Sequence, residues 1–499
     1  MKSFTRSIWM LLAGCLALLT GCEKEPPVPE VINSFTHFEF RKTDNEGSLH
    51  GNITLPTMGN NRVEFVTPLC SDRSNLIATF NTDGGRVYVG NVEQFSGVTP
   101  NDFTSPLTYR IVSESGHISE WVVTISDTGL PIVVINTPNS KLIPSKYEDW
   151  LEGTQLTIYN TDGSIDYQES ISIRGRGNST WNFPKKPYAL KLDEKASILG
   201  MPKHKRWVLL ANWLDRTMMR NSAAFYISEQ TDLAWTPRGE FVEVVLNGRH
   251  KGNYYLCEQI KVDKNRVDIE ELSDENPSGG FILEVDVYFD EVFKFHSPDY
   301  NLPYMFKDPD EVTDMQYGYF YNYIANLEAA LKDDQRFAAR EYVDFIDVDS
   351  FIDWWFVHEL TGNTEPMHPK SSYFHKDADG PLVAGPVWDF DWETFVPYKN
   401  NVWCDTEALY LGRLFQDEAF VARVKERWAL LKPRFDTVPS YIQSLAKRLT
   451  PSAAINLKMW PITEKVNGDE ELSFALAVTR MINAYEGKLY WLNKHIEEL

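Results

Sequence analysis

The order of secondary-structure patterns constrains the fold of this 499-residue chain more than any other feature of the sequence. Short segments of alternating apolar and polar residues fill its first half, separated by Gly, Asn and Asp turns, as in "RVEFVTPL" and "SEWVVTISD". From about Val312 onward helical spacing dominates, as in "YFYNYIANLEAALKD" and "DSFIDWWFVHEL". Strands followed by helices, with polar motifs near the join, predict an α+β protein with two lobes and a cleft between them.

Changes in pattern also predict the domain boundaries. Residues 31–126 resemble a small Ig-like β-sandwich module, for which a spacer is the expected role. An apolar, β-branched strand in "DTGLPIVVINT" (127–137) begins a larger domain. We assign residues 130–499 to this domain, with a core over about 130–435 and a helical C-terminal extension over 436–499.

The N-terminal sequence "MKSFTRSIWMLLAGCLALLTGCEKEPP" predicts export. Two basic residues precede an apolar run over about 8–19, which is too short to span a bilayer and has the layout of a secretory signal. "LLTGC" resembles the bacterial lipobox, which implies cleavage before Cys22 and a lipid on its sulfur. We therefore expect a signal peptide (1–21), a Pro-rich tether (22–30), and a lipoprotein of the outer membrane that faces the periplasm or the exterior. The alternative is an ordinary signal peptide with a chance cysteine.

The charge balance excludes one class of partner. With 49 Lys and Arg against 71 Asp and Glu, the formal net charge is -22. A phosphate backbone or an anionic lipid surface needs a basic face, so nucleic acid is not an expected partner. The cysteines after Cys22 are too scattered for a disulfide framework or a CxxC metal site. They are Cys70, Cys257 and Cys404.

Two aspartates, Asp389 and Asp391, stand two residues apart in the apolar stretch "GPVWDFDWETF" (385–395). Carboxylates are rarely buried without a partner. In a strand, residues two apart point to the same side and lie roughly 7 Å apart. Hard cations such as Mg²⁺ are held by carboxylate oxygens. The stretch therefore predicts a metal site, and the alternative is a turn whose carboxylates cap neighbouring backbone groups.

A second stretch, "RGRGNSTWNFPKKPYALKL" (174–192), combines small residues with positive charges. Backbone N–H groups of a loop such as Gly175–Asn178 can cradle an anion. The pattern is neither a P-loop nor a complete G-x-G-x-x-G, because Thr180 occupies the third glycine position. We predict phosphate binding, with a tight turn and a solvated basic rim as the alternative. The cations around the loop are Arg174, Arg176, Lys185, Lys186 and Lys191.

Two further stretches carry charged residues beside apolar ones. In "HELTGNTEPMHPKSSYFHKD" (358–377) a helix is expected to stop at Gly362, and the loop beyond it carries Glu365. "HELTG" is not HExxH, so the sequence does not support a zinc peptidase. In "KRWVLLANWLDRTMMRNSAAFYISEQ", Asp215 and Arg220 are expected to form a salt bridge that serves the scaffold.

In their order and spacing, these stretches together resemble the CotH kinase family over roughly residues 130–435. The resemblance also uses "VLNGRHKGNYYLCEQIKVDKNRVDI" and "GGFILEVD". It implies an atypical protein-kinase-like fold. It also implies transfer of phosphate from ATP to a protein hydroxyl, with Mg²⁺ or Mn²⁺ as the metal. The expected partners are therefore a nucleotide and an unknown protein acceptor.

The resemblance assigns roles by position. The family's metal-binding aspartate falls on Asp389, with Asp391 beside it, and the family's catalytic aspartate falls on Glu365. Glutamate extends the carboxylate by one methylene, roughly 1.5 Å, and a base must lie within about 2.6–3.2 Å of its proton. Lys191 is expected to reach the phosphates and Glu258 to pair with it. The expected phosphate-binding residues are Arg174, Arg176, Asn178, Lys186, Lys191 and Glu258.

Two other functions compete with a kinase. A degenerate kinase fold can serve as a surface module that binds a glycan or a protein, since the many Trp and Tyr residues suit sugar stacking. A glycoside hydrolase needs two carboxylates roughly 5–9 Å apart, which Asp389 and Asp391 satisfy, although the basic loop then has no role. Nucleotide and metal binding distinguishes the kinase from the glycosidase, and metal-dependent phosphoryl transfer distinguishes it from the binding module.

Overall fold

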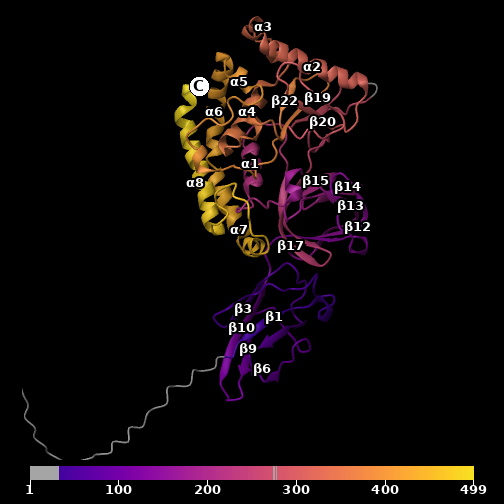
Figure 1. The fold of residues 1–499 in the computed structure, drawn as a ribbon, viewed down its shortest axis with the longest axis vertical. Coiled ribbons are helices and arrows are strands. Elements are labelled where there is room, and N and C mark those ends of the chain that lie inside the picture. The colour runs from indigo at the N-terminus through magenta and orange to yellow at the C-terminus, as the bar shows by residue number, and fades with distance from the viewer. Residues whose placement is uncertain (1–32, 274–275, 277) are drawn as a thin grey trace, which may run out of the picture.

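The computed structural model describes residues 33–273, 276 and 278–499. The predicted lipidation residue Cys22, the signal peptide and the tether therefore lie outside the described residues. The protein is a mixed α+β structure, as the sequence predicts. Figure 1 shows strands in the N-terminal half and helices gathered in the C-terminal half. Within the described residues, none of the helices is both long enough and apolar enough to cross a bilayer.

The N-terminal module is built from strands and one short 3-10 turn (Lys42–Asp44). Its main sheet has six strands in the order β2-β3-β10-β9-β6-β7, and β1 pairs with β5 beside it. Aromatic side chains such as Phe38, Phe40 and Tyr109 fill the space between them. The strands are β1 (Phe35–Glu39), β2 (Thr57–Gly59), β3 (Arg62–Val66), β4 (Leu76–Ile77), β5 (Thr79–Thr82), β6 (Arg86–Val89), β7 (Val92–Glu93), β8 (Pro100–Asn101), β9 (Leu107–Val112) and β10 (Ile118–Ser126).

A seven-stranded closed barrel follows, in the order β11-β12-β13-β14-β15-β17-β16. The parallel pairing of β11 with β16 closes it. Alternate residues such as Leu190, Trp207 and Leu256 point inward and form its own core. The strands are β11 (Ile132–Asn136), β12 (Leu151–Tyr159), β13 (Ile165–Gly175), β14 (Tyr188–Ile198), β15 (Met201–Leu210), β16 (Gly239–Leu246) and β17 (Arg249–Glu258).

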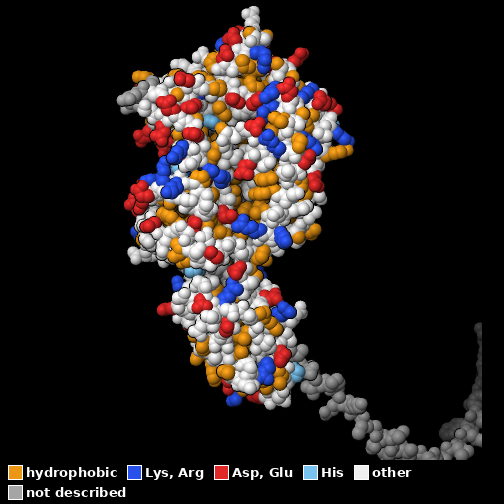
Figure 2. Space-filling model, turned by 180° about the vertical axis from the view of Figure 1, so that it is seen from behind, with side chains coloured by type: hydrophobic (Ala, Val, Ile, Leu, Met, Phe, Trp, Pro, Cys, Tyr) orange, Lys and Arg blue, Asp and Glu red, His pale blue; other side chains and the backbone are white. Residues whose placement is uncertain are grey.

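The module packs directly against this barrel. Val134 of β11 and Val245 of β16 belong to the module's apolar cluster. The backbones touch where Gly51 meets Gly248, since a Cβ on Gly51 would lie 2.0 Å from the Gly248 carbonyl oxygen. The helical part of the chain also contacts the module, because the Nζ of Lys458, in the helix over Val438–Met459, donates to the Pro56 carbonyl oxygen at 3.2 Å. Figure 2 shows the two parts meeting at a narrow waist, with acidic and basic side chains interspersed over this face.

The rest of the chain forms a five-stranded sheet and a helical body around one large core. Helix α4 lies at its centre, because its residues from Ser350 to Thr361 are all buried. The sheet strands are β18 (Phe281–Val285), β19 (Lys294–His296), β20 (Pro303–Asp308), β21 (Ser372–Lys376) and β22 (Leu382–Ala384). The helices are α1 (Arg220–Glu229), α2 (Asp314–Lys332), α3 (Asp334–Ala338), α4 (Val348–Thr361), α5 (Leu411–Leu414), α6 (Glu418–Phe435), α7 (Val438–Met459) and α8 (Phe474–His495).

The predicted scaffold salt bridge between Asp215 and Arg220 is confirmed. The Arg220 side chain is fully buried at the start of α1, and its guanidinium donates to Asp215 and, at 2.6 Å, to Asp469. It also donates from Nε to the Thr394 carbonyl oxygen at 3.1 Å. One cation therefore joins the barrel exit, the C-terminal loop and the segment after Asp391.

Replacing Arg220 by Met should destabilise the protein strongly, because two buried carboxylates would lose their cation. Breaking a buried pair in this way costs about 3–5 kcal/mol, measurable by urea unfolding. The control is Arg62→Ala, which removes an ion pair with Glu64 whose side chains are 60% and 45% exposed. It should leave the midpoint almost unchanged. Equal effects of the two substitutions would contradict this scaffold role.

Candidate active site

A cavity of about 530 Å³ lies between the outer face of the barrel and the five-stranded sheet. The basic loop after β13 forms one wall. The other wall is formed by β18, by the loop before β21 and by the loop after β22. The cavity brings together six of the predicted site residues from three separate parts of the chain. They are Arg174, Arg176, Asn178, Glu365, Asp389 and Asp391.

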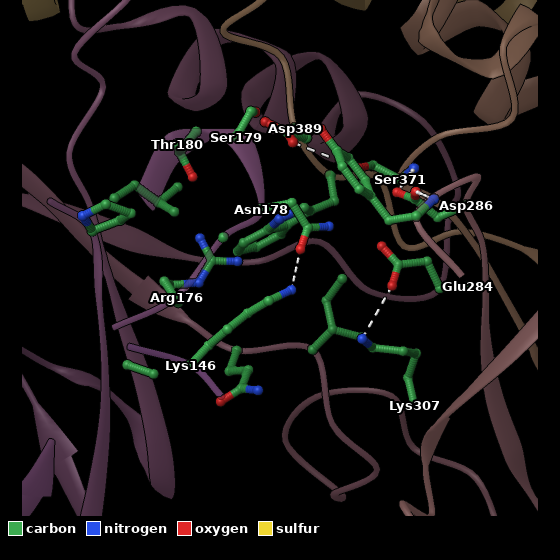
Figure 3. Close-up of a pocket in the computed structure, with 18 of the residues that line it drawn as sticks. Lys146, Arg176, Asn178, Ser179, Thr180, Glu284, Asp286, Lys307, Ser371 and Asp389 are labelled. Carbon is green, nitrogen blue, oxygen red and sulfur yellow. Dashed lines mark hydrogen bonds and ion pairs between the residues drawn. The ribbon is translucent and has the colours of Figure 1, made fainter. Parts of the chain in front are cut away.

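Glycines shape the basic wall. Gly177 has φ +83°, and a Cβ there would lie 2.0 Å from the Thr180 hydroxyl oxygen. A Cβ on Gly175 would enter the Trp181 ring at 2.3 Å. The chain can therefore turn tightly at the end of β13 only with glycine at these two positions. The turn presents the side chains of Arg176, Asn178, Ser179 and Thr180 to the cavity (Figure 3).

Aromatic rings lie against three arginines that line the cavity. The Arg174 guanidinium lies over the Trp150 ring at 4.5 Å, and Arg206 lies over the same ring at 5.0 Å. Arg176 lies 5.3 Å from the Trp388 ring, next to Asp389 in sequence. Stacked guanidinium groups keep their N–H donors free for a bound anion.

Three predicted phosphate-site residues do not line this cavity within the described part of the chain. The Lys186 Nζ instead donates to the Trp181 carbonyl oxygen at 2.5 Å, and Lys191 is exposed on β14, opposite Arg206. The predicted pair of Lys191 with Glu258 is wrong, because Glu258 is buried and accepts two hydrogen bonds of 2.9 Å from the Arg238 side chain. Glu258, at the end of β17, therefore pairs with Arg238 and not with Lys191.

Asp389 and Asp391 lie in an irregular loop after β22, not in the expected strand. The strand expectation is wrong because Asp389 has φ +66°, in the left-handed region. Side-chain amides hold the loop from behind. Asn221 accepts from the Phe390 backbone N–H at 2.8 Å, and Asn467 donates to the Asp391 carbonyl oxygen at 3.0 Å. The left-handed turn therefore sends both carboxyls towards the cavity.

The carboxyls of this wall strongly perturb one another. Burial, then the Asp389 charge, raises the pKa of Glu365 to about 9. Burial raises the pKa of Asp389, against which the Arg176 charge acts. Burial and Asp389 together raise the pKa of Asp391. Glu365 therefore holds its proton at neutral pH unless a bound cation replaces it.

Glu365 begins a short 3-10 turn (Glu365–Met367) just beyond α4. Its carboxylate lies 3.8 Å from the Lys370 ammonium group, the nearest cation on the same loop. The side chain of Glu365 is 16% exposed, so it faces the cavity with little solvent around it. The Lys370 charge therefore acts against the raised pKa of Glu365 without cancelling the effect of burial.

Sequence reasoning missed several cavity residues. Asp286 follows β18, and burial followed by the Glu284 charge raises its pKa to about 6. Its carboxylate accepts from the Ser371 backbone N–H at 3.0 Å, and the Ser371 hydroxyl lies 3.5 Å from Asp389. Glu284 pairs with Lys307 at 3.1 Å, and Figure 3 shows both facing the cavity. A signal was present: "FILEVD" is an apolar strand that ends in two acids.

The donor set of this wall suits a hard divalent cation. Within the described residues, there is no group of three or more His, Cys, Asp or Glu side chains that could hold a metal ion by itself. Mg²⁺ does not need such a group, because it commonly uses one or two carboxylates, waters and substrate phosphate oxygens. Asp389 and Asp391 supply two carboxylates on one loop, and burial is the main cause that raises the pKa of each.

Comparisons with known proteins give one family. The family model described as "CotH kinase protein" matches residues 173–498. It therefore includes the helices that we expected to lie outside the core. A search of curated proteins gives no match. One matching solved structure is described as a putative glycoside hydrolase from Bacteroides thetaiotaomicron, with 16% identity and a TM-score of 0.15, over 37% of this chain and 53% of that chain.

The raised pKa values predict that the metal-free protein becomes less stable as pH rises. Between the ordinary carboxyl pKa near 4.5 and the value near 9 for Glu365, the folded protein binds more protons than the unfolded chain. The free energy of unfolding therefore falls with increasing pH in this range. Glu365→Gln should make the decline shallower, measured as Tm from pH 5 to 9 in a chelator. The exposed Glu152→Gln is the control, and identical slopes for the wild type and Glu365→Gln would contradict the assignment.

Proposed function

This chain belongs to the CotH kinase protein family, and on that premise we propose that it transfers the γ-phosphoryl group of ATP to a protein hydroxyl. Mg²⁺ or Mn²⁺ is the proposed metal. The observation that carries the proposal is the pairing of two unlike walls in one cavity, with arginines on one side and buried carboxyls on the other. Phosphoryl transfer requires this combination, because it depends mainly on positioning and on neutralising phosphate charge.

The two walls are close enough to interact. The Arg176 charge lowers the pKa of Asp389 against the effect of burial, so the basic loop and the carboxylate loop lie within electrostatic reach. Asp389 and Asp391 would hold the metal, which neutralises phosphate charge when bound. Arg174 and Arg176 would bind the phosphate oxygens, and Asn178 would donate a further hydrogen bond.

Glu365 is the proposed base. The acceptor hydroxyl oxygen would attack the γ-phosphorus as the bond to the β–γ bridging oxygen breaks and ADP leaves. The hydroxyl proton would pass to the Glu365 carboxylate. Lys370, 3.8 Å away, favours the ionised form of that carboxylate. Positive charge brought by a metal would act in the same direction.

Other parts of the molecule support finer assignments. A cavity between the barrel and the five-stranded sheet supports a kinase-like organisation in two lobes, and the six-stranded sheet supports an Ig-like module. The lipobox-like "LLTGC" supports a lipid at Cys22 and export to the outer membrane. A glycosidase would leave the stacked arginines without a role, whereas a phosphate gives them one.

Nucleotide binding provides the first test. ATP with Mg²⁺ or Mn²⁺ should raise the Tm of the wild-type protein, since a ligand at 100 times its Kd contributes about 2.7 kcal/mol. Asp389→Asn should abolish the metal-dependent part of the shift because it removes a ligand charge. Asp379→Asn, on an exposed turn, is the control. A full shift in Asp389→Asn would remove Asp389 from the site, and no shift in the folded wild type would favour the binding module.

Turnover tests the base. Glu365→Gln keeps the size of the side chain but cannot accept a proton, so it should retain the thermal shift and lose phosphate transfer by about 10²–10⁴-fold. Transfer is measured from labelled ATP to dephosphorylated casein, with Asp379→Asn again as the control. Glu365→Asp should report whether the added methylene limits the rate. Full activity of Glu365→Gln would show that another group accepts the proton.

A further inference from the structure

Two loops of the candidate site meet behind the cavity. We name residues 362–371, which carry Glu365, the base loop, and residues 386–396, which carry Asp389 and Asp391, the metal loop. The Lys399 side chain lies between them and is buried, with 8% of the residue exposed. Lys399 ends a short 3-10 turn (Pro397–Lys399) and is not among the described residues that line the cavity.

The Lys399 ammonium group uses all three of its donors on these loops. It donates to the Gly362 carbonyl oxygen at 3.0 Å and to the Thr364 hydroxyl at 3.0 Å, both in the base loop. It donates to the Glu393 carbonyl oxygen of the metal loop at 2.9 Å. Three donors are the full capacity of a lysine. The ammonium group also lies 3.7 Å from the Glu393 carboxylate, so its charge acts on the metal loop as well.

The two loops differ in how they are anchored. The metal loop has anchors outside the base loop, because Asn221 and Asn467 hold Phe390 and Asp391, and Arg220 holds Thr394. The end of the base loop is held by the segment after β18, through Pro369 and Ser371, but the part next to Glu365 is tied mainly to the metal loop. Besides Lys399, Asn363 accepts from the Glu365 backbone N–H at 3.1 Å and donates to the Asp389 carbonyl oxygen at 3.3 Å.

We propose that Lys399 is a positioning residue that fixes the distance between Glu365 and the carboxylates of the metal loop. This proposal rests on the proposed function for its consequence in turnover, but the clamp itself is a property of the fold. Gly362 allows the close packing, because it has φ +65° and a Cβ there would lie 3.4 Å from both Cβ and Cδ of Lys399. The Lys399 stem thus lies against the backbone where α4 ends and the base loop begins.

Removing the ammonium group should release the base loop and spare the metal loop. Lys399→Ala removes the donor that is shared by the Gly362 carbonyl oxygen, the Thr364 hydroxyl and the Glu393 carbonyl oxygen. The metal loop keeps its bonds to Asn221, Asn467 and Arg220. A displacement of about 1 Å at a reacting group can cost 10²-fold in rate. Turnover should therefore fall about a hundredfold, while the affinity for Mn²⁺, measured by electron paramagnetic resonance, changes less than about threefold.

Chemical rescue separates lost positioning from general damage. Alanine lacks three methylenes and the ammonium group of lysine, and n-propylammonium ion has the same atoms. The ion should restore ADP release from MnATP. It should also return the hydrogen exchange of the base-loop amides to the wild-type rate. One such amide is that of His368, which donates to the Glu365 carbonyl oxygen at 2.9 Å. n-Propanol, which fills the space without the charge, should not restore either.

Lys376→Ala is the matched control. Lys376 is a second buried lysine, 2% exposed, whose Nζ donates to the carbonyl oxygens of Asp377 and Ala378 at 2.9 and 2.8 Å. It touches neither loop, so its loss should lower stability without changing base-loop exchange or turnover per folded molecule.

Three outcomes decide the proposal. Faster base-loop exchange and lower turnover in Lys399→Ala, both reversed by n-propylammonium, support it. Unchanged exchange, unchanged turnover, or a loss that the ion does not reverse overturns it. A wild-type protein that neither binds nor turns over MnATP defeats the proposed function, and hydrogen exchange then still accepts or rejects the clamp.

Discussion

The repulsion among buried carboxyl groups is the constraint on which the rest of this structure depends. Glu365, Asp389, Asp391 and Asp286 come from three segments and face one cavity, and burial raises the pKa of each. Carboxylates in such surroundings are costly unless cations or hydrogen-bond donors compensate them. The fold places the arginines of the basic loop opposite them, and leaves the remaining charge to protons or to a bound cation.

Holding these groups together requires a rigid frame behind the cavity. Helix α4 is buried on every side and ends at the base loop, and Arg220 joins α1 to the C-terminal loop and to the segment after Asp391. Buried amides and ammonium groups, rather than apolar contacts alone, connect these parts. The C-terminal helices belong to this frame, because Asn467, which holds Asp391, lies between α7 and α8.

Local pattern in the sequence was enough to predict the α+β class, the strand that opens the barrel, the basic loop and the scaffold pair Asp215–Arg220. It was not enough where a side chain acts at long range. Asp389 and Asp391 looked like a strand because the residues around them are apolar, yet tertiary amides hold Asp389 in a left-handed turn. The partner of Glu258 and the position of Lys399 depend on residues 20 or more positions away, or on contacts between loops, which periodicity cannot reveal.

The contact between the N-terminal module and the barrel bears on how the molecule unfolds. Val134 and Val245 belong to the barrel strands β11 and β16, but their side chains are part of the apolar cluster of the module. Separating the two parts would bring these side chains into water and break the bond from Lys458 to Pro56. The free energy of that exposure couples the parts, so the module and the barrel should melt together as one cooperative unit.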